Sequence, residues 1–408
     1  MDGARTRGHP TALAAIGAML RVGAPGAVLL VGPGGVGKTT LALDLAAGLL
    51  CTQDPVEARP CGSCRACRLV ARGVHPDIHR LGPDGPGRQV VIGGPGAKTR
   101  GIRDLIAELA LMPVEGGARV AIVEAAHRMN EDAQAALLKT LEEPPAGATI
   151  VLCADADEPL LPTIRSRCAR IRLGPVGVRD IESILAEAGA AEPPVAARLA
   201  RIAGGRPGFA LAWAARPDAI RERDAIGRSL LDLAIARPAD RLAGIRGLAA
   251  QAAAIAGIPD GAATVVAAAS ADDGATPGRR KRAAPAQPTD GGDAATADAD
   301  GDELEAAGPV RAPAIERRRA AEALIGLWTD VARDLALCQR GLDRSVRDLA
   351  LLDDTRALAI SLDPDAVRAF IDRLGRASVL IAGNASPELV LDDLALAWPR
   401  PRVGSRAA

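Results

Sequence analysis

The sequence is almost without aromatic residues. Its 408 residues include two Phe, three Trp and no Tyr. We therefore expect cores built from Ala, Leu, Val and Ile, and no stacking platform for the bases of single-stranded nucleic acid.

Net charge is lacking too, because 50 Lys and Arg balance 50 Asp and Glu. No overall field attracts the chain to nucleic acid, although a local basic face would do so.

Long apolar runs are also missing. The first residues lack an apolar stretch followed by a cleavage site, and no run reaches the roughly 18 apolar residues that span a membrane. We expect a cytoplasmic protein with no membrane contact. Its seven cysteines should then be reduced or bound to metal rather than paired in disulfides.

Short apolar runs alternate with helical patterns from residue 27 to 175. The runs "AVLLV" (27–31), "RVAIV" (119–123) and "ATIVLCA" (148–154) are continuously apolar. Strands of a parallel sheet are buried on both faces and have this composition, so we predict an α/β fold with a parallel sheet. After about residue 176 the strand signals fade and helical spacing takes over.

The chain therefore divides into segments of different character. We predict a nucleotide-binding α/β domain over 1–175, a small helical domain over 176–225, and a second helical domain formed by 226–268 and 314–400. Residues 269–313 are poor in large apolar residues and rich in Asp, Ala, Gly and Pro. That composition predicts a disordered insert.

The stretch "GPGGVGKTT" directly follows the first predicted strand and precedes a helical pattern. It fits the P-loop pattern G-x-x-x-x-G-K-[ST], in which backbone N–H groups wrap phosphate oxygens. In such a loop Lys38 reaches the β- and γ-phosphates and the hydroxyl of Thr39 ligates Mg²⁺. We predict that ATP or ADP binds with Mg²⁺ through Gly32, Pro33, Gly34, Gly35, Val36, Gly37, Lys38, Thr39 and Thr40, and that Glu124 contributes to the same site.

Four cysteines follow the P-loop helix, at Cys51, Cys61, Cys64 and Cys67. Four thiolates can close a tetrahedral site that leaves no position open for water, so a metal held there would be structural. The spacing favours Zn²⁺, bound by an insert that spans residues 51–67. An iron–sulfur cluster is the alternative, but the fourth cysteine that it requires three residues after Cys67 is missing.

Two later runs carry a family resemblance. "EDAQAALLKTLEEPP" (131–145) and "LLPTIRSRC" (160–168), together with the P-loop and the four-cysteine insert, resemble the clamp-loader branch of the AAA+ ATPases. Within that branch the chain is similar to the gamma/tau and delta-prime subunits of bacterial DNA polymerase III. The resemblance covers roughly residues 10–225, and beyond it only the helical character agrees with the family's collar domain.

The resemblance implies an AAA+ domain, a helical lid and an all-helical collar. It also implies gamma/tau and delta subunits as partners in a hetero-pentameric ring that loads a sliding clamp onto primer–template DNA. Arg167 would be an arginine finger for a neighbouring subunit's ATP site, where a guanidinium stabilises the γ-phosphate charge.

The resemblance also implies contacts with the DNA backbone, for which Arg100 and Arg103 are candidates here. An ordinary solvated helix start explains these two arginines equally well.

The strand that ends at Val123 distinguishes between the two kinds of subunit. Motor members of the family end this strand in Asp-Glu, whereas this chain has Glu124-Ala125. Asp155 stands where motor members place a threonine that senses the γ-phosphate, and Pro207 stands where they place an arginine. We therefore expect a delta-prime subunit that binds nucleotide and hydrolyses it little or not at all.

Other functions remain as alternatives. The first is the gamma/tau motor ATPase of the same clamp loader. The second is another cytosolic P-loop enzyme, such as a nucleotide kinase, which would have an acceptor site and a mobile lid. The third is a purely structural module with an unused P-loop.

Overall fold

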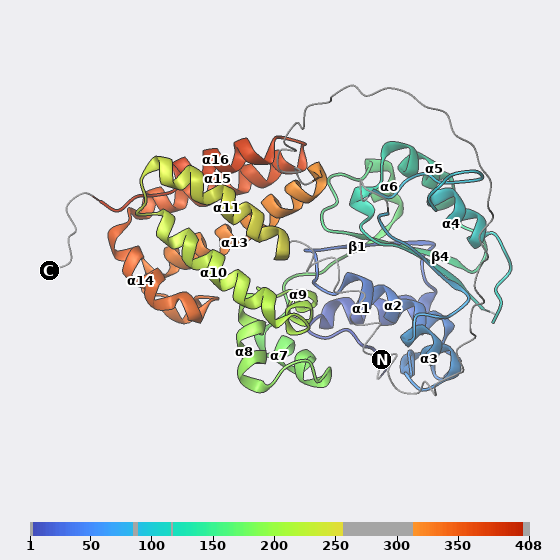
Figure 1. The fold of residues 1–408 in the computed structure, drawn as a ribbon. Helices are drawn as coiled ribbons and strands as arrows, with labels where there is room; N and C mark the ends of the chain where they lie inside the picture. Colours follow the sequence, from blue (N-terminus) through green and yellow to red (C-terminus); the bar gives the residue numbers. More distant parts are fainter. Residues whose placement is uncertain (1–2, 85–88, 116, 256–312, 403–408) are drawn as a thin grey trace, which may run out of the picture.

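The computed structural model describes residues 3–84, 89–115, 117–255 and 313–402. Its first part is built on a five-stranded sheet, all parallel, in the order β2-β3-β4-β1-β5 (Figure 1). The strands are β1 (Ala27–Val31), β2 (Ile78–Leu81), β3 (Arg119–Val123), β4 (Ala148–Ala154) and β5 (Ala169–Arg172). The predicted parallel sheet is confirmed, with β1, β3 and β4 at their predicted bounds, while β2 and β5 were not predicted.

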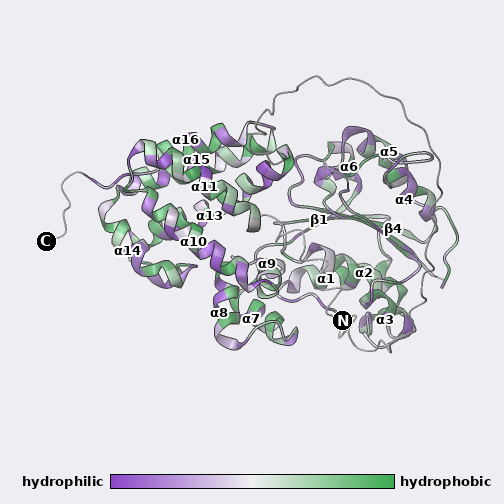
Figure 2. Cartoon of the chain, in the orientation of Figure 1, coloured by the Kyte–Doolittle hydropathy of each residue, from purple (hydrophilic) through white to green (hydrophobic). Residues whose placement is uncertain are grey.

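Successive residues of the strands pack into two different cores. On one face, Val28 and Leu30 pack with Leu41 of the P-loop helix, and on the other Leu29 packs with Leu105. Successive side chains of a strand point to opposite faces, so a strand that is buried on both sides contributes alternate residues to two cores. Figure 1 shows α1 and α2 on one side of the sheet and α4, α5 and α6 on the other, and Figure 2 shows the apolar strands between them. The helices of this part are α1 (Pro10–Val22), α2 (Lys38–Leu50), α3 (Arg65–Ala71), α4 (Ile102–Leu109), α5 (Glu131–Glu142) and α6 (Pro162–Arg167), with 3-10 turns η1 (Val56–Ala58) and η2 (Ala126–Arg128).

Beyond β5 the described residues form helices, as their 3.6-residue periodicity predicts. Helices α7 to α9 lie next to the P-loop side of the sheet, and α10, α11 and α13 to α16 form a helical bundle (Figure 1). These helices are α7 (Val178–Glu187), α8 (Pro193–Ile202), α9 (Pro207–Ala214), α10 (Pro217–Leu233), α11 (Pro238–Ile255), α13 (Ala314–Cys338), α14 (Leu352–Ser361), α15 (Pro364–Ala382) and α16 (Pro387–Ala397), with 3-10 turns η3 (Asp343–Ser345) and η4 (Leu349–Leu351).

Buried charges tie α10 to the end of the bundle. Arg223 forms an ion pair with Asp348, and the exposed fractions of their side chains are 3% and 5%. Nearby, Arg198 of α8 donates to Asp224 of α10 over 2.6 Å. The charges of Arg223 and Asp348 are buried deeply enough to require a partner, whereas Arg198 is 32% exposed. The two contacts connect α8 and α10 with each other and with the segment before α14.

The five aromatic residues fall into two clusters, neither of which is a solvent-facing platform. Trp328, Phe370 and Trp398 form the core of the bundle, and the Trp398 indole donates to the carbonyl oxygen of Leu230 over 2.9 Å. Phe209 and Trp213 meet edge to face beside the P-loop. The few aromatic residues therefore pack against one another inside the protein.

Some expectations are not tested by the described residues. The proposed limits at 175, 225 and 400 remain predictions of domain organisation. Most of the predicted insert, residues 269–312, and the stretch 256–268 lie outside the described residues. Within the described part of the chain, no helix is both long enough and apolar enough to cross a membrane.

Phe370 tests the role of the bundle core. Its ring lies 4.6 Å from that of Trp398 and 5.3 Å from that of Trp328, centroid to centroid. We predict that Phe370→Ala lowers the free energy of unfolding by ~3–5 kcal/mol, because a buried ring is lost and a cavity is left. Val379→Ala, on the exposed side of the same helix, should change it by less than ~0.5 kcal/mol. Equal effects of the two substitutions in urea unfolding followed by tryptophan fluorescence would contradict this account of the core.

Candidate nucleotide and metal sites

The P-loop connects β1 to α2, and two of its glycines are sterically required. Gly37 caps α2 with φ +112°, a backbone conformation that favours glycine. A side chain at Gly32 would place its Cβ 2.4 Å from the carbonyl oxygen of Leu173. Thr39 and Thr40 lie in the first turn of α2, with their side chains partly exposed. The loop therefore has the tight turn and the open helix N-terminus that a phosphate site needs.

Lys38, the cation of this loop, is buried and already has three partners. Its ammonium donates to the carbonyl oxygens of Gly32 and Pro33 over 2.6 and 2.9 Å, and to Asp155 Oδ1 over 2.7 Å. Asp155 directly follows β4, and parallel pairing places Ala154 beside Val31 at the start of the loop. The sheet register thus brings Asp155 to the lysine although 117 positions separate them.

His127 holds Asp155 from the opposite side. The backbone N–H of Asp155 donates to His127 Nδ1 over 3.0 Å, and His127 Nε2 lies 3.8 Å from Asp155 Oδ2. Burial lowers the pKa of His127, and the neighbouring Asp155 carboxylate opposes this. Sequence reasoning identified Asp155 as an unusual acid at this position, but it found neither the ion pair with Lys38 nor the part played by His127.

At the end of β3, Glu124 is engaged by an arginine on the adjacent strand. Arg80 of β2 donates to Glu124 Oε1 through Nε over 2.9 Å and through Nη2 over 2.5 Å. The next residue, Ala125, has a left-handed backbone (φ +51°, ψ +47°) and carries only a methyl group. Arg80 was missed by sequence reasoning, because a single arginine in a short polar strand gives no signal.

The start of α9 packs on the P-loop. The backbone N–H of Gly208 donates to the carbonyl oxygen of Gly35 over 2.8 Å, and the Phe209 ring occupies the space that a side chain at Gly35 would need. The guanidinium of Arg206 stacks on that ring, 4.1 Å from its centroid. Arg206 is the N-cap of α9 and Pro207 its first residue. Arg206 is thus used in packing beside the loop.

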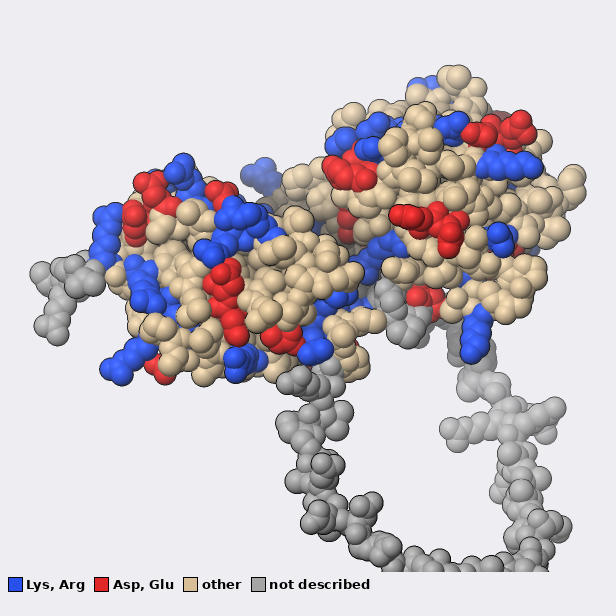
Figure 3. Space-filling view, turned by 90° about the horizontal axis from the view of Figure 1, so that it is seen from above, with Lys and Arg blue, Asp and Glu red and all other residues tan. Residues whose placement is uncertain are grey.

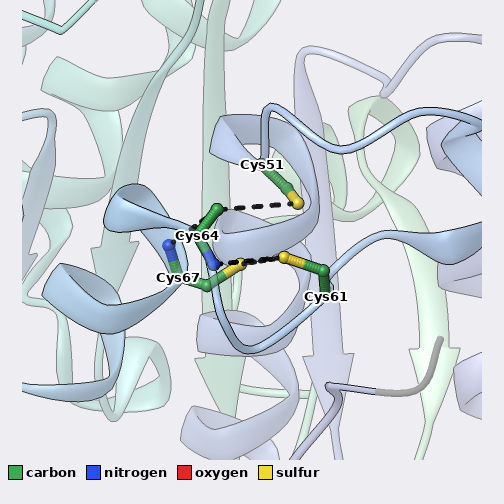
Figure 4. A group of neighbouring side chains, drawn as sticks. All are labelled: Cys51, Cys61, Cys64 and Cys67. Carbon is green, nitrogen blue, oxygen red and sulfur yellow. Dashed lines mark hydrogen bonds between the residues drawn. The ribbon is translucent and has the colours of Figure 1, made fainter.

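The four cysteines of the insert converge on one point (Figure 4). Their sulfur atoms all lie within 4.8 Å of one another, with 4.0 Å between Cys61 and Cys67 and 3.9 Å between Cys51 and Cys64. Sulfurs that share a tetrahedral metal at about 2.3 Å are about 3.8 Å apart, whereas a disulfide bond would require about 2.05 Å. The cluster has the size and geometry of a four-thiolate metal site.

Local hydrogen bonds favour the thiolates of Cys61 and Cys64, whereas burial raises the pKa of Cys51 and of Cys67. The N–H groups of Cys64 and Cys67 point at the sulfurs of Cys61 and Cys64, over 3.3 and 3.4 Å. A hydrogen bond from the Ser63 hydroxyl, together with the backbone N–H groups of Cys64 and Ser63, lowers the pKa of the Cys61 thiol to about 6. His75 and His79 are not part of the cluster: the Nδ1 of His75 accepts from the backbone N–H of Asp77, and His79 pairs with Glu108.

The other three cysteines have different surroundings. Cys153 is buried in β4, and burial raises its pKa to about 12. Cys168 and Cys338 are only partly buried, and desolvation raises the pKa of each to about 11. These thiols stay protonated at neutral pH and behave as small packing residues.

Arg167, the candidate finger, is the last residue of α6. Its Nη2 lies 2.5 Å from Glu142 Oε1 at the end of α5, and its Nη1 donates to the carbonyl oxygen of Thr163 over 3.1 Å. The side chain is 36% exposed, so a second protein can reach it. Arg167 was predicted as a finger only from the resemblance to the clamp-loader family.

The two candidate DNA-contacting arginines precede and begin α4. Arg100 is paired with Glu108 over 2.5 Å and also donates to the carbonyl oxygen of Arg80. Arg103 is exposed and packs beside Gly94. On the face drawn in Figure 3, positive and negative side chains are interspersed. A strong basic patch is not visible on that face.

The sheet order, the P-loop at the end of β1 and the helices that follow define a P-loop protein of the AAA+ class. Residues 13–177 match the family model described as "DNA polymerase III, delta subunit". Over 144 residues the chain is 41% identical to DNA polymerase III subunit delta' of Pseudomonas aeruginosa, covering 35% of this chain and 42% of that protein. Over 199 residues it is 34% identical to the Escherichia coli delta' subunit, covering 47% and 56%.

The related tau subunits match as well. The chain is 35% identical over 177 residues to DNA polymerase III subunit tau of Salmonella typhimurium, covering 42% of this chain and 26% of that protein. Among solved structures, a DNA polymerase III gamma subunit-related protein from Thermotoga maritima is 16% identical, with a TM-score of 0.37 and coverage of 94% and 97%. The chain spans about half the length of the curated delta' subunits named above. Its N-terminal part is similar to both the delta' and the tau subunits of DNA polymerase III.

The cysteine cluster can be tested by metal content. We predict about one metal ion per purified chain, and its loss in Cys64→Ala, because three thiolates no longer close the tetrahedral site. Cys338→Ala, which alters a cysteine outside the cluster, should keep the metal. Elemental analysis by plasma mass spectrometry measures both. Stoichiometric metal retained in Cys64→Ala would show that the ion binds elsewhere.

Proposed function

We propose that this chain is a delta-prime subunit of a bacterial clamp loader. In this function it assembles with gamma/tau and delta subunits in a hetero-pentameric ring, and the ring places a sliding clamp on primer–template DNA for the replicative DNA polymerase III holoenzyme. Support comes from the family match over residues 13–177 and from the delta' relatives. DNA contacts would be made to the backbone by local basic side chains, because the chain has no net charge to attract nucleic acid and no aromatic platform to stack bases. A protein of replication would act in the cytoplasm.

The observation that carries the non-motor assignment is the end of β3. A motor needs a carboxylate there to orient the attacking water, and loss of a positioned general base costs ~10²–10⁴ in rate. Ala125 offers a methyl group, and Glu124 is bound by Arg80. Hydrolysis by this chain is therefore slow or absent, while nucleotide binding remains a property of the P-loop.

Each element of the site has a role in this proposal. ATP or ADP binds at residues 32–40, with Lys38 on the phosphates and Thr39 as a ligand of the nucleotide's Mg²⁺. Glu124 would contribute to the same site, with Arg80 bound to its Oε1. Zn²⁺ is the metal of the four cysteines, because their spacing and the 3.9 and 4.0 Å sulfur separations suit a closed tetrahedral site. Its role is to hold the insert together.

The gamma/tau motor is the second candidate. The P-loop geometry around Gly32 and Gly37 and the match to tau subunits favour it. It requires a base that Ala125 does not supply, so the delta-prime function fits the site better.

Arg167 tests the proposal in the assembled ring. The complex would be reconstituted from this chain and the gamma/tau, delta and clamp proteins of the same organism. We predict that Arg167→Ala lowers hydrolysis at the adjacent motor site by ~10³ or more, the usual contribution of an arginine finger, and abolishes or severely slows clamp loading onto primed DNA.

Arg179→Ala is the matched control, since it removes the same charge from the exposed first turn of α7. It should load clamps at the wild-type rate. Clamp loading by Arg167→Ala at the wild-type rate would refute the finger, and failure of the wild-type chain to enter the ring would refute the proposed function.

A further inference from the structure

All three N–H donors of the Lys38 ammonium already have acceptors, so none is free for a phosphate. A lysine has three N–H donors. Here they are directed at the carbonyl oxygens of Gly32 and Pro33 and at the carboxylate of Asp155, all within 2.9 Å. The side chain is only 8% exposed. A phosphate oxygen can contact this ammonium only if one of the three partners leaves.

Of the three, Asp155 is the partner that carries a charge and can move. The two carbonyl oxygens belong to the backbone of the loop itself, whereas the Asp155 side chain is 48% exposed. Its second carboxylate oxygen would lie 3.3 Å from a Cβ placed on Gly34. One carboxylate therefore faces both the lysine and the glycine turn, which are the groups that a P-loop offers to phosphate.

The surroundings fix the backbone of Asp155 in that position. His127 binds its backbone N–H over 3.0 Å, and β4, which ends at Ala154, is paired with β1. The neighbouring acids are different: Asp157 is buried and paired with Arg170 and Arg172. Glu158 is exposed on the same loop. Of these three acids, Asp155 is the one that contacts Lys38.

We propose that Asp155 is an internal substitute for nucleotide phosphate and sets the affinity of the P-loop for nucleoside di- and triphosphates. The inference rests on the nucleotide site of the proposed function. A nucleotide binds by displacing the carboxylate from Lys38, and the displaced charge then stays beside the phosphates and repels them. The chain consequently holds nucleotide weakly, although its glycines and lysine have the full P-loop pattern.

Asp155→Asn is the direct test, because it keeps the shape of the side chain and removes its charge. The affinities of the purified full-length chain for Mg²⁺-ADP and Mg²⁺-ATP would be measured by isothermal titration calorimetry. We expect Asp155→Asn to bind both nucleotides at least ~10-fold more tightly than the wild type, since like charges no longer meet in the site. Asp155→Ser, which is smaller and also neutral, should show the same gain.

Two further variants show where the gain arises. Glu158→Gln removes a charge from the same loop, and its affinity should stay within ~2-fold of the wild type because the ion pair between Asp155 and Lys38 is left intact. Adding Lys38→Ala to Asp155→Asn should abolish the gain, since the lysine is the group that the carboxylate covers. Melting curves with and without nucleotide would verify that each variant is folded.

The outcomes separate the inference from the proposed function. Unchanged affinity in both Asp155→Asn and Asp155→Ser overturns the inference, and so does an absence of nucleotide binding in all variants. Weaker binding also overturns it, because Asp155 would then support the nucleotide, for example as a ligand of its Mg²⁺. None of these results decides whether the chain enters the clamp-loader ring, which the Arg167 experiment tests separately.

Discussion

The parallel pairing of β1 with β4, and of β4 with β3, is the constraint on which the site depends. Parallel strands end at the same edge of a sheet, so the residues that follow them meet there. The register that places Val31 beside Ala154 brings the P-loop and Asp155 together, and β3 delivers Glu124 to the same edge. One edge thus carries a phosphate loop, its cation and an acid that neutralises that cation. The carboxylate of Asp155 therefore contacts the same ammonium that a nucleotide phosphate would contact in a P-loop.

The helical parts are connected to this edge by packing and by buried charge. Phe209 at the start of α9 lies on Gly35 of the P-loop, and Arg206 stacks on the ring. A little further along the chain, Arg223 of α10 is bound to Asp348 of the bundle. A shift of α9 against the sheet would therefore change the contacts of the P-loop.

The local features of the chain were predictable from sequence, and the long-range ones were not. The P-loop, the apolar strands and the cysteine spacing are contiguous patterns with direct physical meaning. The strands "IHRL" (78–81) and "ARIR" (169–172) were missed, because short polar strands at the two edges of a sheet have no apolar run and owe their conformation to their neighbours. The bond from Arg80 to Glu124 was missed for the same reason. Asp155 was recognised as unusual, yet its contact with Lys38 depends on a sheet register that no local pattern encodes.

We propose that this chain binds nucleotide without being a motor. The most direct test is single-turnover hydrolysis of labelled ATP by the purified chain, at protein concentrations high enough to saturate the nucleotide, with bound nucleotide measured in the same sample. The account predicts that bound ATP remains ATP and that hydrolysis does not exceed that of a Lys38→Ala chain. Hydrolysis that clearly exceeds this background would mean that the chain has a catalytic base and acts as a motor subunit.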